Sequence, residues 1–302
     1  MVESIDRQIV HALQIDGRAP FARVAEVLGV SEHTVARRYR KLREAKAIRV
    51  VGALNGILLG HHAWTIRLRC TPDVGAPLAA ALAKRKDTHW VHLLSGGTEI
   101  SCYQQTESDT ELLLDKLPRS VLDVSAQSVL RGFVAPSTWS GLACLDDDQI
   151  EHLKPRVEPE QVELTDSDHA LIDLLNKDGR MGYAELAHRA GTSESTARRR
   201  VEHLRKARVL DIQLDADPKA FGYAAEARLW MTAPPAKLAE VGANLATHPE
   251  VYFAAATTGR AGLVASVVCR DSLDLYRYLT ERIGPNVNEV ESAPVLRTVK
   301  RN

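Results

Sequence analysis

Residues 30–48 read VSEHTVARRYRKLREAKAI, and residues 192–210 read TSESTARRRVEHLRKARVL, at a constant offset of 162 positions. In both segments, apolar residues recur at the spacing of one helical face, while arginines and lysines occupy most other positions. A serine precedes each run, where its hydroxyl can cap the first turn of a helix. The chain therefore carries the same basic, amphipathic helix twice.

The repeat extends well beyond these two helices. The tripeptide Asp16–Arg18 (DGR) recurs as Asp178–Arg180, and Asp6 aligns with Asp168. Further aligned pairs are Ile9 and Leu171, Leu13 and Leu175, Phe21 and Tyr183, Ala25 and Ala187, Gly29 and Gly191, and Leu42 and Leu204. With only two copies and a long period, this pattern indicates a duplicated multidomain unit rather than a solenoid.

Each copy opens with the pattern of three short helices. In the first copy, apolar residues recur at helical spacing before Gly17, and a second apolar face ends at Gly29. Two short helices joined by a glycine-containing turn, the second basic on its free face, predict a helix-turn-helix. The β-prone residues 48–54 are expected to form a wing. We therefore predict winged helix-turn-helix domains at residues 1–55 and 165–215.

The basic helices suit the major groove of DNA, which an α-helix enters by its N-terminal turns. Short polar side chains there approach base edges, and arginines reach guanines or phosphates. The residues expected to contact DNA are Ser31, His33, Thr34, Arg37, Arg38, Arg40 and Lys41 in the first copy, and Ser193, Ser195, Thr196, Arg198, Arg199 and Arg200 in the second. The alternative is that each segment is an amphipathic helix whose arginines are only solvated. The basic helix occurs twice, each time as the last of three predicted helices, and this favours DNA binding.

The two predicted recognition helices differ on their free faces. His33 aligns with Ser195, Ala36 with Arg198, and Arg40 with Glu202. Because these positions face the groove in the predicted arrangement, we expect an asymmetric operator rather than a perfect palindrome.

Charge is separated along a chain that is neutral overall. The 302 residues include 39 Lys and Arg and 39 Asp and Glu. Residues 1–55 hold ten basic and six acidic side chains, and residues 165–212 hold nine and eight. Residues 141–166 hold eight acidic and two basic side chains, together with Pro155 and Pro159. We therefore expect residues 141–164 to be an extended, solvated linker that stays off DNA.

A pattern of strands and helices follows each helix-turn-helix. The first copy predicts strand 64–70, helix 76–86, strands 88–94 and 98–105, helix 108–117 and strand 123–134; the second predicts strand 224–232, helix 236–246, strands 250–257 and 262–269, helix 272–283 and strand 288–299. This βαββαβ order predicts ferredoxin-like domains at residues 61–140 and 220–302, within an α+β chain. Because helices cover one face of such a sheet, we expect the two domains to pair, within one chain or between chains of a homodimer or larger assembly.

These features together resemble the Lrp/AsnC (feast/famine) transcriptional regulators. The resemblance is carried by DGR, by the S-x-x-T-x-x-R-R pattern of Ser31–Arg38 and Ser193–Arg200, and by a glycine turn between the middle strands of each βαββαβ (RAM-type) domain. It covers nearly the whole chain, twice, except residues 141–164. It implies a regulator that binds double-stranded operator DNA and responds to a small effector such as an amino acid.

The resemblance also implies where an effector binds, at the turn between the second and third strands. The implied residues are Gly96, Gly97, Thr98 and Glu99 in the first copy, and Thr258, Gly259, Arg260 and Gly262 in the second. The family's turn usually carries an acid, and Glu99 occupies that place in the first copy, whereas Gly262 occupies it in the second. A carboxylate that holds an ammonium group is therefore present only at the first turn. The alternative is that both are ordinary tight turns.

Other chemistry has weaker support in the sequence. Neighbouring histidines such as His61 and His62 point to opposite faces of a strand, so no metal or other cofactor is expected. Siroheme decarboxylases share the duplicated fold and remain the enzymatic alternative, although no matching set of His, Tyr and Arg residues is evident. No enzyme motif, signal peptide or membrane-spanning segment is present, so we expect a cytoplasmic, nucleoid-associated protein that is not an enzyme.

Overall fold

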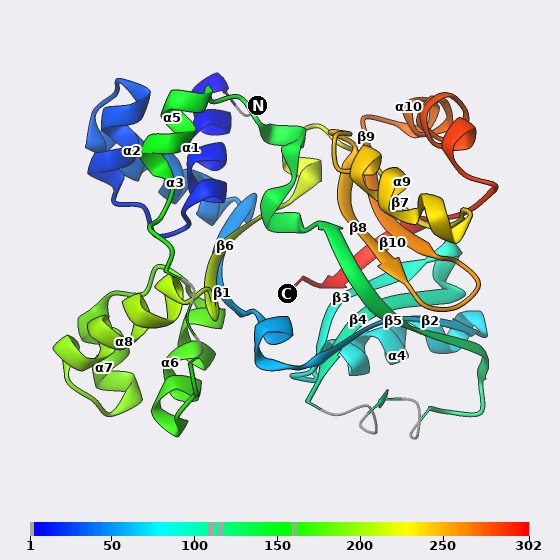
Figure 1. The fold of residues 1–302 in the computed structure, drawn as a ribbon, viewed down its shortest axis with the longest axis horizontal. Helices are drawn as coiled ribbons and strands as arrows, with labels where there is room; N and C mark the ends of the chain where they lie inside the picture. The colour runs from blue at the N-terminus through cyan, green and yellow to red at the C-terminus, as the bar shows by residue number, and fades with distance from the viewer. Residues whose placement is uncertain (1–2, 108–111, 114–116, 159, 161, 302) are drawn as a thin grey trace. The chain divides into compact units, whose positions relative to one another are not determined.

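The chain folds into two compact units, each assembled from both copies of the repeat (Figure 1). The computed structural model describes residues 3–107, 112–113, 117–158, 160 and 162–301. One unit consists of residues 1–59 and 142–221 and contains both three-helix segments. The other consists of residues 60–141 and 222–302 and contains both βαββαβ segments. The two three-helix segments therefore associate with each other, and so do the two βαββαβ segments. The chain passes between the units three times.

The helical unit contains two helix-turn-helix domains with equivalent elements. They are α1 (Ser4–Ile15), α2 (Phe21–Leu28), α3 (Glu32–Glu44) and β1 (Ile48–Leu54), and α6 (Asp166–Lys177), α7 (Tyr183–Ala190), α8 (Glu194–Lys206) and β6 (Leu210–Ala216). Gly29 and Gly191 end α2 and α7 with φ angles of 64° and 70°, a left-handed conformation that glycine adopts without steric cost. These two glycines set the turn before each basic helix.

Strands β1 and β6 pair with each other and do not form a separate wing on each domain. The expectation of a wing at residues 48–54 is therefore wrong in detail: β1 forms a two-stranded antiparallel sheet with its counterpart in the repeat. The register places Val51 opposite Gln213, which is the residue 162 positions later. A residue that pairs with its own equivalent marks a local two-fold relation between the copies. The sheet thus joins the two helix-turn-helix domains.

The segment 141–164 is only partly the extended linker that its acidity and prolines predict. Residues 147–153 form α5 (Asp147–Leu153), which packs against α1 and α2 (Figure 1). Leu142, Leu145 and Leu153 are buried, and the Gln149 side-chain amide donates to the Val27 carbonyl at 3.1 Å. The leucines that lie among the acidic residues anchor this part of the chain, because burial of a leucine side chain is favourable compared with its exposure to water. Residues 154–158 are exposed and irregular.

The second unit is a closed, eight-stranded barrel made from both βαββαβ segments. Its strands are β2 (His62–Cys70), β3 (Thr88–Leu94), β4 (Glu99–Thr106), β5 (Val121–Val134), β7 (Ala225–Thr232), β8 (Val251–Thr257), β9 (Leu263–Cys269) and β10 (Glu289–Lys300). They follow the order β10-β3-β4-β2-β5-β8-β9-β7. The two copies therefore pair within one chain, as one of the two predicted arrangements requires.

Two long strands close the barrel. The first part of β5 pairs with β2 and its last part pairs with β8 of the other copy. Strand β10 likewise pairs with β7 and then with β3. The sheets were expected to cover each other face to face; in addition, their edges are joined, so each described strand of the barrel pairs on both sides.

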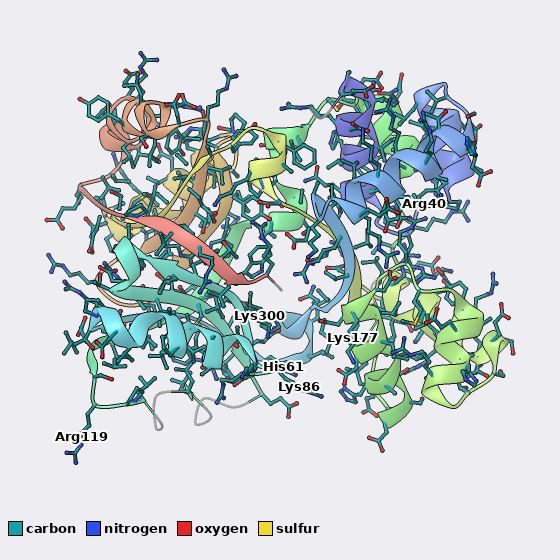
Figure 2. The ribbon with its side chains drawn as sticks, turned by 180° about the vertical axis from the view of Figure 1, so that it is seen from behind. Arg40, His61, Lys86, Arg119, Lys177 and Lys300 are labelled. Carbon is teal, nitrogen blue, oxygen red and sulfur yellow. The ribbon has the colours of Figure 1, made fainter. Side chains whose placement is uncertain are left out.

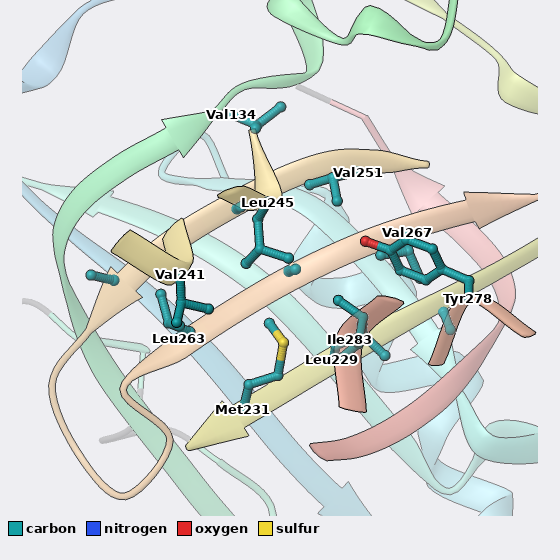
Figure 3. Close-up of a cluster of buried hydrophobic side chains, with 14 of the residues drawn as sticks. Val134, Leu229, Met231, Val241, Leu245, Val251, Leu263, Val267, Tyr278 and Ile283 are labelled. Atoms are coloured by element: carbon teal, nitrogen blue, oxygen red, sulfur yellow. The ribbon is translucent and has the colours of Figure 1, made fainter. Parts of the chain in front are cut away.

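Helices cover the outside of this barrel. They are α4 (Pro72–Ala83), α9 (Leu238–Leu245) and α10 (Ser272–Arg277), which continues as a π-helical segment, residues 278–283. Figure 3 shows the cluster beneath α9 and α10, where Leu229, Leu263 and Val267 meet Leu245 and Tyr278. The βαββαβ order and the α+β fold class are confirmed. The predicted helix 108–117 lies largely outside the described residues, and no helix among the described residues is long and apolar enough to cross a membrane.

Candidate nucleic-acid interface

The third helix of each helix-turn-helix domain buries one stripe and exposes the rest. The buried positions are Val35, Tyr39 and Leu42 in α3, and Ala197, Val201 and Leu204 in α8. At the N-termini, the hydroxyls of Ser31 and Ser193 accept the backbone N–H groups of Thr34 and Thr196, each at 3.1 Å. These caps fix the first turn of each helix, which is the part that a groove would receive.

Most residues predicted to contact DNA lie on the open side of these helices. The exposed ones are Ser31, His33, Arg37, Arg40 and Lys41 on the first copy, with Thr34 half-buried, and Ser193, Ser195, Thr196, Arg198 and Arg199 on the second. Arg37 and its equivalent Arg199 have no hydrogen-bond or ion-pair partner within the described part of the chain. Both guanidinium groups are therefore available to an external anion.

Arg38 and Arg200, which were also predicted to contact DNA, form ion pairs within their own domains. Arg38 donates to both carboxylate oxygens of Glu3, at 2.6 and 2.7 Å, and lies 3.6 Å from Asp6. Arg200 donates to both oxygens of Asp168, at 2.6 and 2.8 Å. These bonds tie the third helix to the first, because bidentate guanidinium–carboxylate pairs fix geometry as well as charge.

The Asp168 carboxylate is stabilised in its charged form. Burial by itself raises the pKa of this group, but hydrogen bonds from Arg200 and Thr165 outweigh burial and lower the pKa from 3.8 to about 2. Asp168 is fully buried, whereas the Arg200 side chain is 26% exposed. The alignment of Asp6 with Asp168 was evident in the sequence, but the spacing of residues could not show which arginine pairs with each aspartate.

The two recognition helices differ in how much of their charge is free. Arg198 lies 3.4 Å from the Glu194 carboxylate, and its guanidinium stacks 4.7 Å from the Tyr183 ring centre. The Glu202 carboxylate accepts a hydrogen bond from the Tyr183 hydroxyl. At the position equivalent to Glu202, the first copy exposes Arg40, which projects from α3 (Figure 2). The first helix therefore presents the stronger positive surface.

The first predicted effector turn already contains an internal counter-charge. The Glu99 carboxylate accepts from Nε of Arg67 at 2.8 Å, and the same guanidinium donates to Glu291 at 2.7 and 2.8 Å and stacks 3.9 Å from Trp230. Burial opposes the Arg67 charge, but hydrogen bonds to Glu291 and Glu99 leave its pKa raised. The Glu99 carboxylate, predicted to hold an ammonium group, is therefore already paired with an arginine.

The other residues of the two turns shape the backbone. Gly96 and Gly97 adopt φ angles of 67° and 98°, and the Thr98 carbonyl accepts the Cys70 N–H at 2.9 Å. In the second copy, Thr258 exchanges hydrogen bonds with Ser128 of β5, Gly259 has a φ of 90°, and the Gly262 carbonyl accepts the Thr257 N–H at 3.0 Å. The Arg260 side chain is 91% exposed, 3.8 Å from Glu289. These contacts fit the tight-turn alternative.

The barrel interior contains a buried arginine that the sequence reading did not identify. Arg228 is 4% exposed and donates to the hydroxyls of Ser266, at 2.6 Å, and Thr65, at 3.2 Å. Strands β7 and β2 are not neighbours, so the contact to Thr65 crosses the interior. Burial lowers the Arg228 pKa to about 10. The sequence signal was a charged residue within a mostly apolar strand that also contains Glu226.

Histidines of the chain do not gather into a metal-binding group in the described residues, where no cluster of three or more His, Cys, Asp or Glu side chains is found. His92 is buried and lies 3.1 Å from the Thr298 hydroxyl. Burial and the nearby Arg228 and Arg301 lower its pKa to about 3. This histidine is therefore neutral at physiological pH.

Comparison with known proteins places these elements in a family. The AsnC-type helix-turn-helix domain matches residues 3–43 and 164–205, and the Lrp/AsnC ligand binding domain matches residues 227–302. An uncharacterised HTH-type transcriptional regulator of Pyrococcus horikoshii is 33% identical over 144 residues, which are 47% of this chain and 90% of that protein. The chain belongs to the Lrp/AsnC family. A second HTH-type transcriptional regulator of that organism, FL11, is 32% identical over 143 residues, 46% of this chain and 94% of FL11.

These matched lengths show how this Lrp/AsnC chain departs from its relatives. Each relative corresponds to about one copy of the repeat, and this chain holds two. The duplicated arrangement is found in the crystal structure of the siroheme decarboxylase NirDL, which superposes with a TM-score of 0.65 over 98% of this chain and 92% of that one, at 15% sequence identity. At that identity the likeness establishes a shared fold and nothing about chemistry.

Proposed function

We propose that this chain is a DNA-binding transcriptional regulator that reads both halves of one operator with α3 and α8. The single observation that carries the proposal is the pair of capped, basic recognition helices exposed in one unit and related by the β1–β6 sheet. A homodimer obtains two recognition helices by association of two chains, whereas this chain contains both. Its relatives are named transcriptional regulators, which supports the same role.

The structure suggests a division of labour among the arginines. Arg37 and Arg199 are free and exposed, so they are the proposed contacts to bases or phosphates. Arg38 and Arg200 hold the domains together and are proposed to support the interface from behind. The remaining proposed contacts are Ser31, His33, Thr34, Arg40 and Lys41 on α3, and Ser193, Ser195, Thr196 and Arg198 on α8.

Selection of bound duplexes from a random pool tests this proposal. The expected result is an operator with two unlike half-sites, because Arg40 and Glu202 occupy equivalent positions. Arg37→Ala should weaken binding to the selected operator by about 1–3 kcal/mol if the side chain meets a base. The matched control is Arg131→Ala, an exposed arginine of the barrel unit. Recovery of no sequence above background, or equal losses for both variants, would count against the proposal.

A small-molecule effector is the second part of the proposal. It is supported by the match of residues 227–302 to the family's ligand binding domain. Because Arg67 already neutralises Glu99, an amino acid would have to displace an internal ion pair at the first turn. Thermal unfolding with each of the common amino acids tests the effector. A shift of the melting temperature that grows with concentration supports it, and no shift at millimolar concentrations opposes it.

We infer that the chain is not a tetrapyrrole enzyme, despite the shared fold of NirDL. The interior of the barrel is occupied by Arg228, Trp230, Arg67 and their partners. The visible spectrum of purified protein mixed with an iron-containing tetrapyrrole distinguishes the alternatives. A stoichiometric new absorption band would favour the enzyme, and an unchanged tetrapyrrole spectrum would favour the regulator.

A further inference from the structure

We propose that the two DGR tripeptides form a reciprocal clasp that fixes the separation of α3 and α8 and thereby sets the spacing of the operator half-sites. The clasp consists of Asp16–Arg18 and Asp178–Arg180, together with Arg43 and Arg205. Its effect on operator spacing rests on the proposed function of DNA binding. Its effect on the geometry of the helical unit does not.

The arginine of each tripeptide reaches into the other copy. Arg18 donates to the carbonyls of Gly179, at 2.9 Å, and Met181, at 3.1 Å. Arg180 donates to the carbonyls of Gly17, at 2.7 Å, and Ala19, at 3.1 Å. Each donor has its equivalent 162 residues away, and so has each acceptor. The two forks are therefore one interaction made twice, as expected across a local two-fold axis.

Aromatic rings hold both guanidinium groups in place. Arg18 stacks 4.6 Å from the ring centre of Tyr183, and Arg180 stacks 4.2 Å from that of Phe21. Burial lowers the pKa of Arg180, although a guanidinium stays protonated at neutral pH. A guanidinium is planar, so it can donate to two carbonyls and stack on a ring at the same time. A lysine ammonium group cannot make all of these contacts.

The aspartate of each tripeptide connects the clasp to the recognition helices. Asp16 accepts the Arg18 backbone N–H at 2.9 Å and also accepts from Arg205 of α8 at 2.7 Å. Asp178 accepts the Arg180 backbone N–H at 3.0 Å and, in the equivalent contact, accepts from Arg43 of α3 at 2.7 Å. Each recognition helix is thus tied to the turn of the opposite copy.

The glycine of each tripeptide permits the close approach. A Cβ atom on Gly17 would lie 2.5 Å from the Ile212 carbonyl oxygen, and one on Gly179 would lie 2.9 Å from the carbonyl carbon of Val51. The Gly179 N–H donates to the Val50 carbonyl at 2.8 Å. Both turns therefore abut the β1–β6 sheet, so all three residues of the tripeptide serve contacts between the copies.

This arrangement makes the arginines positioning residues for DNA recognition. The copies are linked by the β1–β6 sheet, by packing of α1 on β6 and of α6 on β1, by the two forks and by the two ion pairs, and the ion pairs end on α3 and α8 themselves. Loss of the forks should leave each helix-turn-helix domain folded, because the buried stripes of its helices and the Glu3–Arg38 and Asp168–Arg200 pairs are untouched. The separation of the helices should then become variable.

Distance measurement between spin labels on α3 and α8, without DNA, tests the geometric claim. The labels would be placed at Glu32→Cys and Glu194→Cys, equivalent exposed positions, with Cys144 changed to Ser. We expect one narrow distance distribution for the parent chain and a broad one for Arg18→Lys/Arg180→Lys. The control Arg282→Lys, whose ion pair with Glu250 belongs to the barrel unit, should match the parent. A narrow, unchanged distribution in the folded double variant would overturn the clasp.

Binding to duplexes with altered spacing tests the functional claim. Insertion of about five base pairs between the selected half-sites turns one of them by roughly half a helical turn. We expect at least about a tenfold loss of affinity for the parent chain and less than about threefold for the double variant. Equal losses in both proteins would refute the role in spacing. If the distance distribution broadens in the double variant but the parent chain binds no DNA, the clasp is supported and the proposed function is rejected.

Discussion

Replacement of Asp168 by asparagine removes the carboxylate that holds α8 against α6, and its cost can be worked from the structure. The side chain is fully buried, and its pKa falls from 3.8 to about 2 in the folded chain. At about 1.36 kcal/mol for each unit of pKa difference, the folded state gains about 2.4 kcal/mol at neutral pH. Because an asparagine amide keeps part of the hydrogen bonding, we expect Asp168→Asn to cost about 2 kcal/mol.

The pH dependence of this loss follows from the sign of the pKa change. A carboxylate whose pKa is lowered on folding stabilises the protein above its unfolded pKa, and this contribution is lost as the pH falls through the folded pKa. The difference between parent and variant should therefore be constant above about pH 5, fall to about half at pH 3, and vanish below about pH 2. No other group needs to be invoked, because only Asp168 differs between the two proteins.

Urea unfolding of both proteins at pH 7, 5 and 3 measures this prediction. Near neutral pH the melting temperature of the variant should also be lower by about 4–8 °C. A variant as stable as the parent at pH 7 would refute the ion pair between Asp168 and Arg200. A stability difference that stays the same down to pH 3 would show that asparagine acts through packing and not through charge.

Two further substitutions probe features that the sequence did not reveal. Arg228→Met should leave the free energy of unfolding unchanged or raise it, because the buried guanidinium has only hydroxyl partners among the hydrogen bonds and ion pairs described; a loss above about 2 kcal/mol in urea unfolding would contradict this. Leu153→Ala should destabilise the helical unit by about 2–4 kcal/mol and speed tryptic cleavage after Arg156, because Leu153 anchors α5; unchanged cleavage would argue that α5 is not held by this residue.

Local features of the fold could be predicted because local chemistry determines them. Ser31 and Gly29 define the turn and cap of the helix-turn-helix through their own backbone preferences, and the alternation around Ile66 defines a strand. The exposed Arg37 follows from helical periodicity alone. Each of these depends on residues a few positions apart.

Features that depend on distant residues were missed or misassigned. Arg38 and Arg37 are adjacent in a basic run, and only the position of Glu3, the N-cap residue of α1, distinguishes their surroundings. The edge pairing of β5 with β8 joins segments more than 100 residues apart, and periodicity carries no information about such partners. In residues 141–164 the acidic composition concealed the leucines that dock the segment.

The recurrence of DGR was evident, but its role required coordinates. The tripeptide matches the pattern of a helix-ending turn, and Gly17 satisfies that reading by itself. The partners of Arg18 lie 161 and 163 residues away, on the other copy. An internal repeat predicts that two equivalent surfaces exist, and only the fold shows that they meet.

The dependence of DNA affinity on salt concentration tests the central claim most directly. Each phosphate contact that releases a counterion adds about 0.9 to the slope of log affinity against log salt concentration. If α3 and α8 both lie against the duplex, binding of the selected operator should weaken steeply with salt; with Arg37 and Arg199 each on a phosphate, Arg37→Ala/Arg199→Ala should reduce the slope by about 1.8 relative to the parent and to Arg131→Ala. An affinity that does not vary with salt, or a slope that the double variant leaves unchanged, would contradict the account.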